Sequence, residues 1–283
     1  MMEVLGIPVP PSLVTSWVDW LAPDRQPFYV TARQATEWDL PLSDEEPDPQ
    51  LRDTYRVYDL DGELWRSWLS EAEFLALPDP TRAKLVRAQT EHGRDAVPTV
   101  RAWKDVLGPR IREQADGHRF VWWKSLLSAP DAVLRRIVSD EFEPSRHTEV
   151  QAEVWRDAAR LVPRARELAG TFAQGSGPNC FGTVMAACGV EGAESQWVQR
   201  QPFDTWLAES ATRGGRDGVP GTVLVWRSSD GAVQHAAVTL GSGWALHKPS
   251  QAWASPRKVR TVDEILRASR RHGWRLQRHS LDR

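Results

Sequence analysis

The sequence predicts an α+β fold, with an α-rich N-terminal region followed by a compact domain in which a helix packs on an antiparallel sheet. Capped helical patterns dominate residues 68–169, whereas residues 220–248 hold three short β-rich runs separated by tight turns. The 283 residues suffice for two domains of ordinary size. We expect these domains to span residues 1–165, whose role their pattern does not reveal, and residues 166–283.

Composition excludes several classes of protein. Apolar residues make up 41%, which is typical of a globular chain, and the longest apolar runs are too short for a membrane-spanning helix. Two cysteines rule out a disulfide framework and a four-thiolate metal site. The N-terminus lacks the basic start and apolar core of a signal peptide, so we expect a cytoplasmic protein, with non-classical delivery as the alternative.

Charge is unevenly distributed, although the net charge is only −2. Residues 1–80 carry 16 acids and five bases, whereas residues 257–283 carry nine bases and three acids. A solvated basic face packed against the acidic region is the simplest interpretation, and a basic surface for an acidic partner is the alternative. We therefore do not expect nucleic-acid binding.

Local signals predict the elements of the N-terminal region. Residues 55–62 have the pattern of a short strand that ends in a turn. Ser70 and Glu73 form a capping box that begins a helix. Further helices are expected at 81–93 and after Pro98.

The strongest helical pattern covers residues 149–169, where apolar residues recur every three or four positions. Thr148 is the expected N-cap and Gly170 the expected stop. Pro163 is expected to kink this helix.

The pattern changes after Gly170. A loop rich in Gly and Pro runs into a short apolar helix that begins at Cys180, and a second helix follows at 202–215. The remaining expected elements are strands at 221–227, 233–240 and 244–248, a helix capped by Thr261 and Glu264, and a last strand at 274–280. The turns between the first three strands are short, so these strands are expected to be antiparallel neighbours.

The candidate nucleophile is Cys180. At a helix N-terminus the helix dipole favours its thiolate, and its own backbone N–H points to where an oxyanion would form. We therefore expect Cys180 to alkylate readily at pH 6. Cys188, at the other end of the same helix, has the surroundings of a buried small hydrophobe and is expected to stay unlabelled.

Two histidines on adjacent predicted strands, His235 and His247, would complete a nucleophile, a base and an orienting group. Their same-face neighbours Ala237 and Ala245 are small, which would leave a slot for the Cys180 helix.

Strand parity decides whether the two histidines can meet. A three-residue loop at 241–243 would put Ala237 opposite His247 and both histidines on one face, toward the N-terminus of the Cys180 helix. Such a loop requires a left-handed third residue, which Gly243 supplies.

These motifs resemble those of the papain-like cysteine peptidases, particularly the compact NlpC type. Gln174-Gly175-Ser176-Gly177-Pro178-Asn179-Cys180-Phe181 is similar to the papain pattern Gln-Gly-Ser-x-x-x-Cys-Trp, and His235-Ala236-Ala237-Val238 is similar to the segment that carries the base. The 55-residue gap between Cys180 and His235, and the 12 residues from His235 to His247, suit the NlpC type. The resemblance covers about residues 165–255.

The resemblance implies a papain-like domain and a thiol hydrolase that cleaves an amide or peptide bond without a metal or cofactor. Cys180 would be the nucleophile, His235 the base, His247 the third catalytic group and Gln174 the oxyanion-hole amide. Gln251 and Ser250 are the alternatives for the third group. The expected partner is a peptide or protein substrate.

Two other classes of function stay open. The same triad can pass the acyl group to an amine or a lipid, as a transglutaminase-like acyltransferase does. The domain can also be a pseudoenzyme that only binds.

Overall fold

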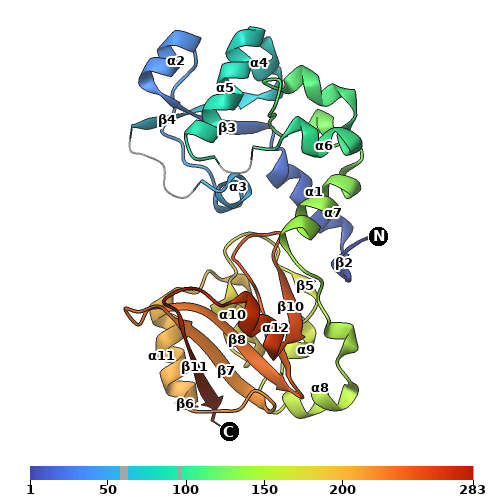
Figure 1. Ribbon diagram of the computed structural model, residues 1–283, viewed down its shortest axis with the longest axis vertical. Helices are drawn as coiled ribbons and strands as arrows, with labels where there is room; N and C mark the ends of the chain where they lie inside the picture. Colours follow the sequence, from blue (N-terminus) through green and yellow to red (C-terminus); the bar gives the residue numbers. More distant parts are fainter. Residues whose placement is uncertain (58–62, 95–96, 283) are drawn as a thin grey trace. The chain divides into compact units, whose positions relative to one another are not determined.

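The computed structural model describes residues 1–57, 63–94 and 97–282, apart from the side chains of Arg110 and Glu113 (Figure 1). The chain divides into two compact units. The N-terminal unit consists mainly of Pro10–Ile137, and the C-terminal unit of Val138–Arg283 together with Glu3–Val9. Within the described ranges, no helix is long and apolar enough to cross a membrane.

The expected boundary at residue 165 differs from this division. Val154, Trp155 and Leu168, which precede or adjoin that boundary, belong to the main apolar core of the C-terminal unit. Residues 138–165 therefore belong to the unit that carries the candidate site, and the apolar side chains from Val150 onward pack in its core.

The N-terminal unit is α-rich and holds one antiparallel strand pair, β3 with β4. Its elements are α1 (Pro11–Leu21), β3 (Arg25–Thr31), α2 (Ala32–Trp38), α3 (Pro49–Tyr55), β4 (Leu64–Ser70), α4 (Glu71–Ala76), α5 (Asp79–Glu91), α6 (Val100–Leu107), the 3-10 helices η1 (Pro109–Gln114) and η2 (Lys124–Leu126), and α7 (Pro130–Glu141), which runs past the boundary. Phe28, Phe74 and Trp123 pack ring against ring in its core.

The capping box of Ser70 and Glu73 is confirmed at the start of α4, and the expected helices at 81–93 and after Pro98 correspond to α5 and α6. The strand expected at 55–62 is wrong at its start, because Tyr55 ends helix α3; residues 58–62 lie outside the described ranges. Residues 68–70, expected to be helical, end strand β4, since Trp68 and Leu69 pair with β3.

The C-terminal unit is built on a seven-stranded sheet in the order β5-β10-β9-β8-β7-β11-β6, with antiparallel neighbours throughout. Its strands are β5 (Thr171–Phe172), β6 (Ala211–Arg213), β7 (Pro220–Arg227), β8 (Val233–Gly241), β9 (Trp244–His247), β10 (Pro256–Thr261) and β11 (Arg275–Leu281). A separate pair, β1 (Met2–Val4) with β2 (Ile7–Val9), lies at the N-terminus. The helices are η3 (His147–Glu149), α8 (Ala152–Ala158), α9 (Ala165–Leu168), α10 (Cys180–Ala187), η4 (Ala193–Ser195), α11 (Arg200–Ser210) and α12 (Val262–Ala268).

Helices cover both faces of this sheet (Figure 1). On one face, α10 and α8 share an apolar core with Ala236 and Val238 of β8. On the other face, α12 packs on Ala237 and Ala245. The slot that those two small residues leave is therefore filled by α12, and the expectation that the Cys180 helix docks there is wrong.

The single helix expected at 149–169 is also wrong. The segment forms two short helices, α8 and α9, separated by a turn that contains Pro163. Proline lacks the N–H that a continuous helix needs, so the chain breaks there instead of bending. Gln151, not Thr148, is the N-cap, whereas Gly170 has the positive φ expected of a stop.

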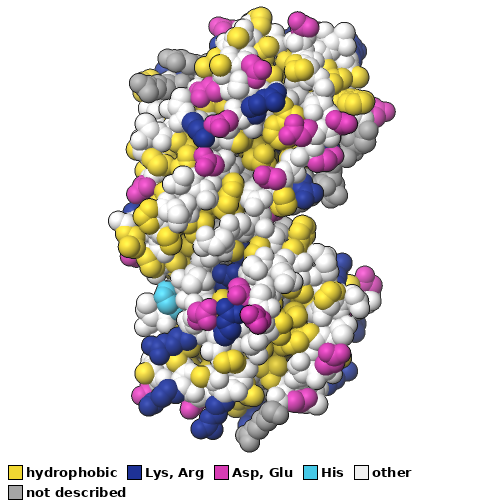
Figure 2. Space-filling view, turned by 180° about the vertical axis from the view of Figure 1, so that it is seen from behind, with side chains coloured by type: hydrophobic (Ala, Val, Ile, Leu, Met, Phe, Trp, Pro, Cys, Tyr) yellow, Lys and Arg dark blue, Asp and Glu magenta, His cyan; other side chains and the backbone are white. Residues whose placement is uncertain are grey.

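Two basic residues near the C-terminus have acidic partners inside their own unit. Arg278 pairs with Asp217, and Arg260 pairs with Glu143 and Glu264. On the face in Figure 2, Lys and Arg side chains of the lower half, which is the C-terminal unit, lie next to Asp and Glu side chains.

We expect Gly182→Ala to destabilise the C-terminal unit. A Cβ at Gly182 in α10 would collide with the carbonyl oxygen of Ala193, and overpacking of this kind costs roughly 1–3 kcal/mol, more than the helix propensity that alanine adds. Faster hydrogen exchange of the α10 amides would measure the loss. Gly218→Ala is the matched control, because nothing lies within 4 Å of a Cβ there; equal exchange in both variants would contradict the prediction.

Candidate active site

Cys180 is the first residue of α10, as the sequence predicts, and Asn179 is the N-cap. Asn179 Oδ1 accepts a hydrogen bond from the backbone N–H of Gly182 at 3.0 Å, and Asn179 Nδ2 donates to the carbonyl oxygen of Val198 at 2.7 Å. Both ends of the amide are thus engaged. The start of the helix, and the thiol with it, is fixed against the loop that contains Val198.

His235 and His247 lie on one face of the sheet, as predicted. His235 Nε2 is 3.2 Å from His247 Nδ1, a hydrogen bond between rings whose planes are at 80°. The ring of Trp226, on the neighbouring strand β7, lies 5.3 Å from the His235 ring, centroid to centroid. The base is therefore held on two sides.

The turn between β8 and β9 differs from the predicted three-residue loop. Gly241 pairs with Trp244, so the turn has two residues, Ser242 and Gly243, both with positive φ. The register shifts between Thr239 and Gly241, which marks a β-bulge. The bulge supplies the extra residue that the loop was expected to supply, and the positive φ of Gly243 is confirmed.

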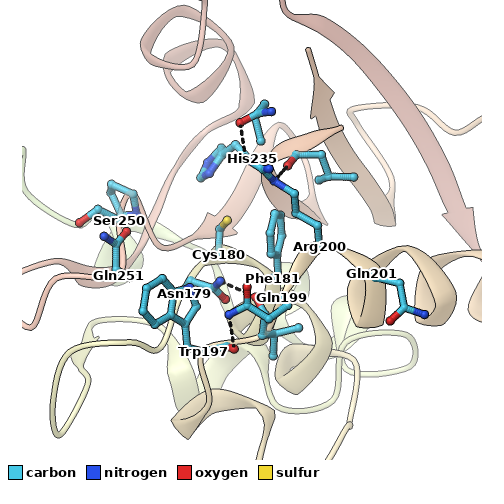
Figure 3. A pocket seen from close by; sticks show the side chains of 14 residues that line it. Asn179, Cys180, Phe181, Trp197, Gln199, Arg200, Gln201, His235, Ser250 and Gln251 are labelled. Atoms are coloured by element: carbon cyan, nitrogen blue, oxygen red, sulfur yellow. Dashed lines mark hydrogen bonds between the residues drawn. The ribbon is translucent and has the colours of Figure 1, made fainter. Parts of the chain in front are cut away.

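A pocket of about 490 Å³ brings Cys180 and His235 together (Figure 3). It is lined by residues 179–181, 197–201, 233–235 and 249–251. In Figure 3 the sulfur of Cys180 points into the pocket, toward the side on which His235 lies. Within the described residues no hydrogen bond joins the two side chains. His235 Nε2 bonds to His247, so Nδ1 is the ring nitrogen of His235 that this bond does not occupy.

The protonation of this pair differs from the expectation. Burial raises the pKa of Cys180 to about 11, and N–H groups of Ala236, Phe181 and Cys180 itself offset this only in part. Burial lowers the pKa of His235 to about 4. The lowered thiol pKa expected from the helix dipole is wrong because desolvation is the larger effect. Both shifts favour a neutral thiol beside a neutral imidazole.

His247 is even less able to carry a proton. Burial, followed by the charges of His235, Lys258 and Arg260, holds the pKa of His247 well below its ordinary value. A neutral His247 has one proton, on either Nδ1 or Nε2. If His235 Nδ1 is to accept a proton from the thiol, its Nε2–H must donate to His247 Nδ1, and the His247 proton then sits on Nε2.

The other predicted site residues differ in whether they line the pocket. Gln174 is exposed and is not among the residues that line the pocket, so no contact connects it with an oxyanion position. Ser250 and Gln251 do line the pocket, whereas His247 does not. Cys188 is half-buried at the end of α10, and burial raises its pKa to about 12.

Sequence reasoning missed two pocket residues, Trp197 and Arg200. Trp197 is 51% exposed, unusually high for so large an apolar side chain. Arg200 donates from Nε to the carbonyl oxygen of Val233 and from Nη2 to Gln234 Oε1. Neither residue belongs to a spaced motif, and only the fold brings the 197–201 segment to the thiol.

No protein-family model, curated protein or solved structure matches this chain. The likeness to papain-like peptidases therefore rests on the motifs around Cys180 and His235 alone. Within the described residues, no group of three or more His, Cys, Asp and Glu side chains is arranged to hold a metal ion.

We expect the site histidines to make folding acid-sensitive. A group whose pKa falls on folding contributes stability above its unfolded pKa, and that stability is lost as the pH falls from about 6.5 toward the folded value. For His235, whose folded pKa is about 4, the loss between pH 7 and pH 5 is about 2 kcal/mol. Urea unfolding at both pH values should show a smaller loss for His235→Gln than for the wild type.

His272→Gln is the control for this experiment, since His272 is exposed in the same unit. It should keep the wild-type pH dependence. An unchanged dependence in His235→Gln would mean that His235 is as easily protonated in the folded protein as in the unfolded chain.

We also expect the resting thiol to be protonated at neutral pH. The rate of alkylation of Cys180 by iodoacetamide, followed by mass spectrometry of the modified peptide, should rise about tenfold per pH unit between pH 7 and pH 9, since only the thiolate reacts. Cys188 should react more slowly throughout. A plateau below pH 8 would instead indicate an ion pair of thiolate and imidazolium.

Proposed function

We propose that the protein is a cysteine peptidase or amidase of papain-like character that uses Cys180 and His235. One observation carries the proposal: the cysteine that begins α10 and a histidine oriented by a second histidine line the same pocket. A nucleophile, a base and a group that orients the base are the parts that thiol catalysis needs.

Because both partners are neutral at rest, His235 acts as a general base. Its Nδ1 takes the proton from Cys180 as the sulfur attacks an amide carbonyl carbon, and the backbone N–H of Cys180 stabilises the oxyanion. The imidazolium of His235 then protonates the leaving amine. Water, activated by the same histidine, adds to the thioester and releases the acid and the thiol.

The pocket favours a peptide with an acidic group near the cleaved bond. Arg200 is the one Lys or Arg among its described lining residues, and no Asp or Glu is among them. The exposed ring of Trp197 offers a flat apolar surface at the same pocket. An amide carbonyl, a carboxylate and an apolar side chain would each have a partner.

The test is mass spectrometry of the protein treated with a thiol-reactive acyl probe. We expect one acyl adduct on Cys180, its absence in Cys180→Ala, and an unchanged yield in Cys188→Ala, which is the matched control. Reaction at Cys188 alone would overturn the assignment of the nucleophile.

Activity of the variants provides a second test. Cys180→Ala and His235→Ala should each abolish hydrolysis of a peptide found by screening, and the double variant should be no worse, because the two residues act in one step. His247→Gln should retain part of the activity, because glutamine can still hydrogen-bond to His235 Nε2. Full activity of His235→Ala would discard the mechanism.

A binding module is the second candidate, since burial favours an unreactive thiol at Cys180. Such a protein would bind a peptide in the pocket without any acyl adduct. An acyltransferase would form the adduct and then pass it to an added amine in preference to water.

A further inference from the structure

A second cavity lies on the α12 face of the sheet, beside His247. Its volume is about 330 Å³. His247 and Lys258, directly opposite each other on β9 and β10, both line it, together with Arg260. The sides are formed by α12 and residues 141–143. His247 lines this cavity and His235 lines the first pocket, and a hydrogen bond at His247 Nδ1 joins the two rings.

The second ring nitrogen of His247, Nε2, is unsatisfied. His247 is 4% exposed, and its Nε2 has no hydrogen-bond partner among the described residues. Buried polar atoms in folded proteins nearly always have a partner, and where the protein supplies none, a bound water, ion or ligand often does. An acceptor at this nitrogen would hold the His247 proton on Nε2, which is also the tautomer that catalysis by His235 Nδ1 requires.

Cations without an ion pair surround the same cavity. Lys258 is 5% exposed, and its Nζ donates to the carbonyl oxygen of Glu143 at 3.2 Å. Arg271 Nη1 donates to the carbonyl oxygens of Ala268 and Arg270. Over the described part of the chain, neither cation has a carboxylate within ion-pair distance.

The acids of the cavity have partners already. Glu143 and Glu264 both pair with Arg260, and Glu141 also has an interaction of its own. The remaining wall is apolar, formed by Phe142, Ile265 and Ala268 beside Pro249. The cavity therefore combines a histidine with an unpartnered ring nitrogen, an unpaired buried cation and an apolar surface.

We propose that this cavity binds a small monocarboxylate with a short apolar chain, and that its occupancy controls the catalytic pair. The carboxylate accepts hydrogen bonds from His247 Nε2–H and Lys258 Nζ, and its chain contacts Ile265 and Phe142. With its proton held on Nε2, His247 can only accept at Nδ1, so His235 must donate from Nε2. The Nδ1 of His235 is then free to take the thiol proton.

The control of the catalytic pair rests on the proposed function, whereas the binding of a carboxylate in the cavity does not. Butyrate is the probe, and butyramide is its neutral control. Sodium chloride keeps the ionic strength constant in all samples, because salt screens surface charges. Titration calorimetry should show saturable binding of butyrate to the full-length protein. Butyramide should bind at least tenfold more weakly, since it cannot form the charged contacts.

Two arginines on or beside α12 provide matched variants. Arg271→Gln removes a cation that lines the cavity, and Arg267→Gln removes an exposed one that does not. Butyrate affinity should fall in the first and stay unchanged in the second. Lys258→Gln should lower it by about tenfold, the effect of one charge-assisted hydrogen bond. Equal affinity in wild type and Lys258→Gln would overturn the site.

Coupling to the catalytic pair is measured by the rate at which Cys180 reacts with iodoacetamide at pH 7. Saturating butyrate should raise this rate several-fold, with no rise in His247→Gln. Binding that leaves the rate unchanged would overturn the coupling. Failure of the proposed function would instead appear as a Cys180 that forms no acyl adduct, while the calorimetric result still decides the carboxylate site.

Discussion

The hydrogen bond between His235 and His247 is the interaction on which the other features of the site depend. It needs two neighbouring strands whose register brings both rings to one face. A plain two-residue turn would move His247 to the other face, because side chains alternate along a strand. The β-bulge between Thr239 and Gly241 restores the parity. One extra residue in a strand therefore decides which nitrogen of the base is left for the thiol.

Burial of the thiol determines the chemistry more than its position at the helix N-terminus does. A helix dipole contributes about 0.3–1 kcal/mol to a nearby charge. The rise of the Cys180 pKa from 9.0 to about 11 corresponds to roughly 3 kcal/mol against the thiolate. The dipole and the three N–H groups therefore reduce the cost of the charge but do not remove it. Cys180 is therefore a thiol at rest, and His235 removes its proton only as the sulfur attacks the substrate.

Much of the C-terminal unit followed from local signals. The start of α10, the hairpin strands and the capping box of Thr261 and Glu264 depend on residues within a few positions of one another, and all are present. Strands β5 and β10 were missed because their pairing is a long-range contact without a clear alternating pattern. The prediction of a single helix at 149–169 was wrong because the apolar periodicity continues across Pro163, where the helix breaks. Trp197 and Arg200 reach the pocket only through the tertiary fold.

The unsatisfied Nε2 of His247 affects where the protons of the two histidines sit. Leaving a buried donor unpaired costs about 1–3 kcal/mol, so within an otherwise closed site the proton of His247 prefers Nδ1 by a comparable amount. That tautomer makes His235 Nε2 the acceptor and puts the His235 proton on Nδ1, where it blocks transfer from the thiol. An acceptor at Nε2 removes this preference and so increases the population of the competent tautomer. The burial that keeps Cys180 and His235 neutral thus also makes the pair sensitive to what occupies the cavity beside His247.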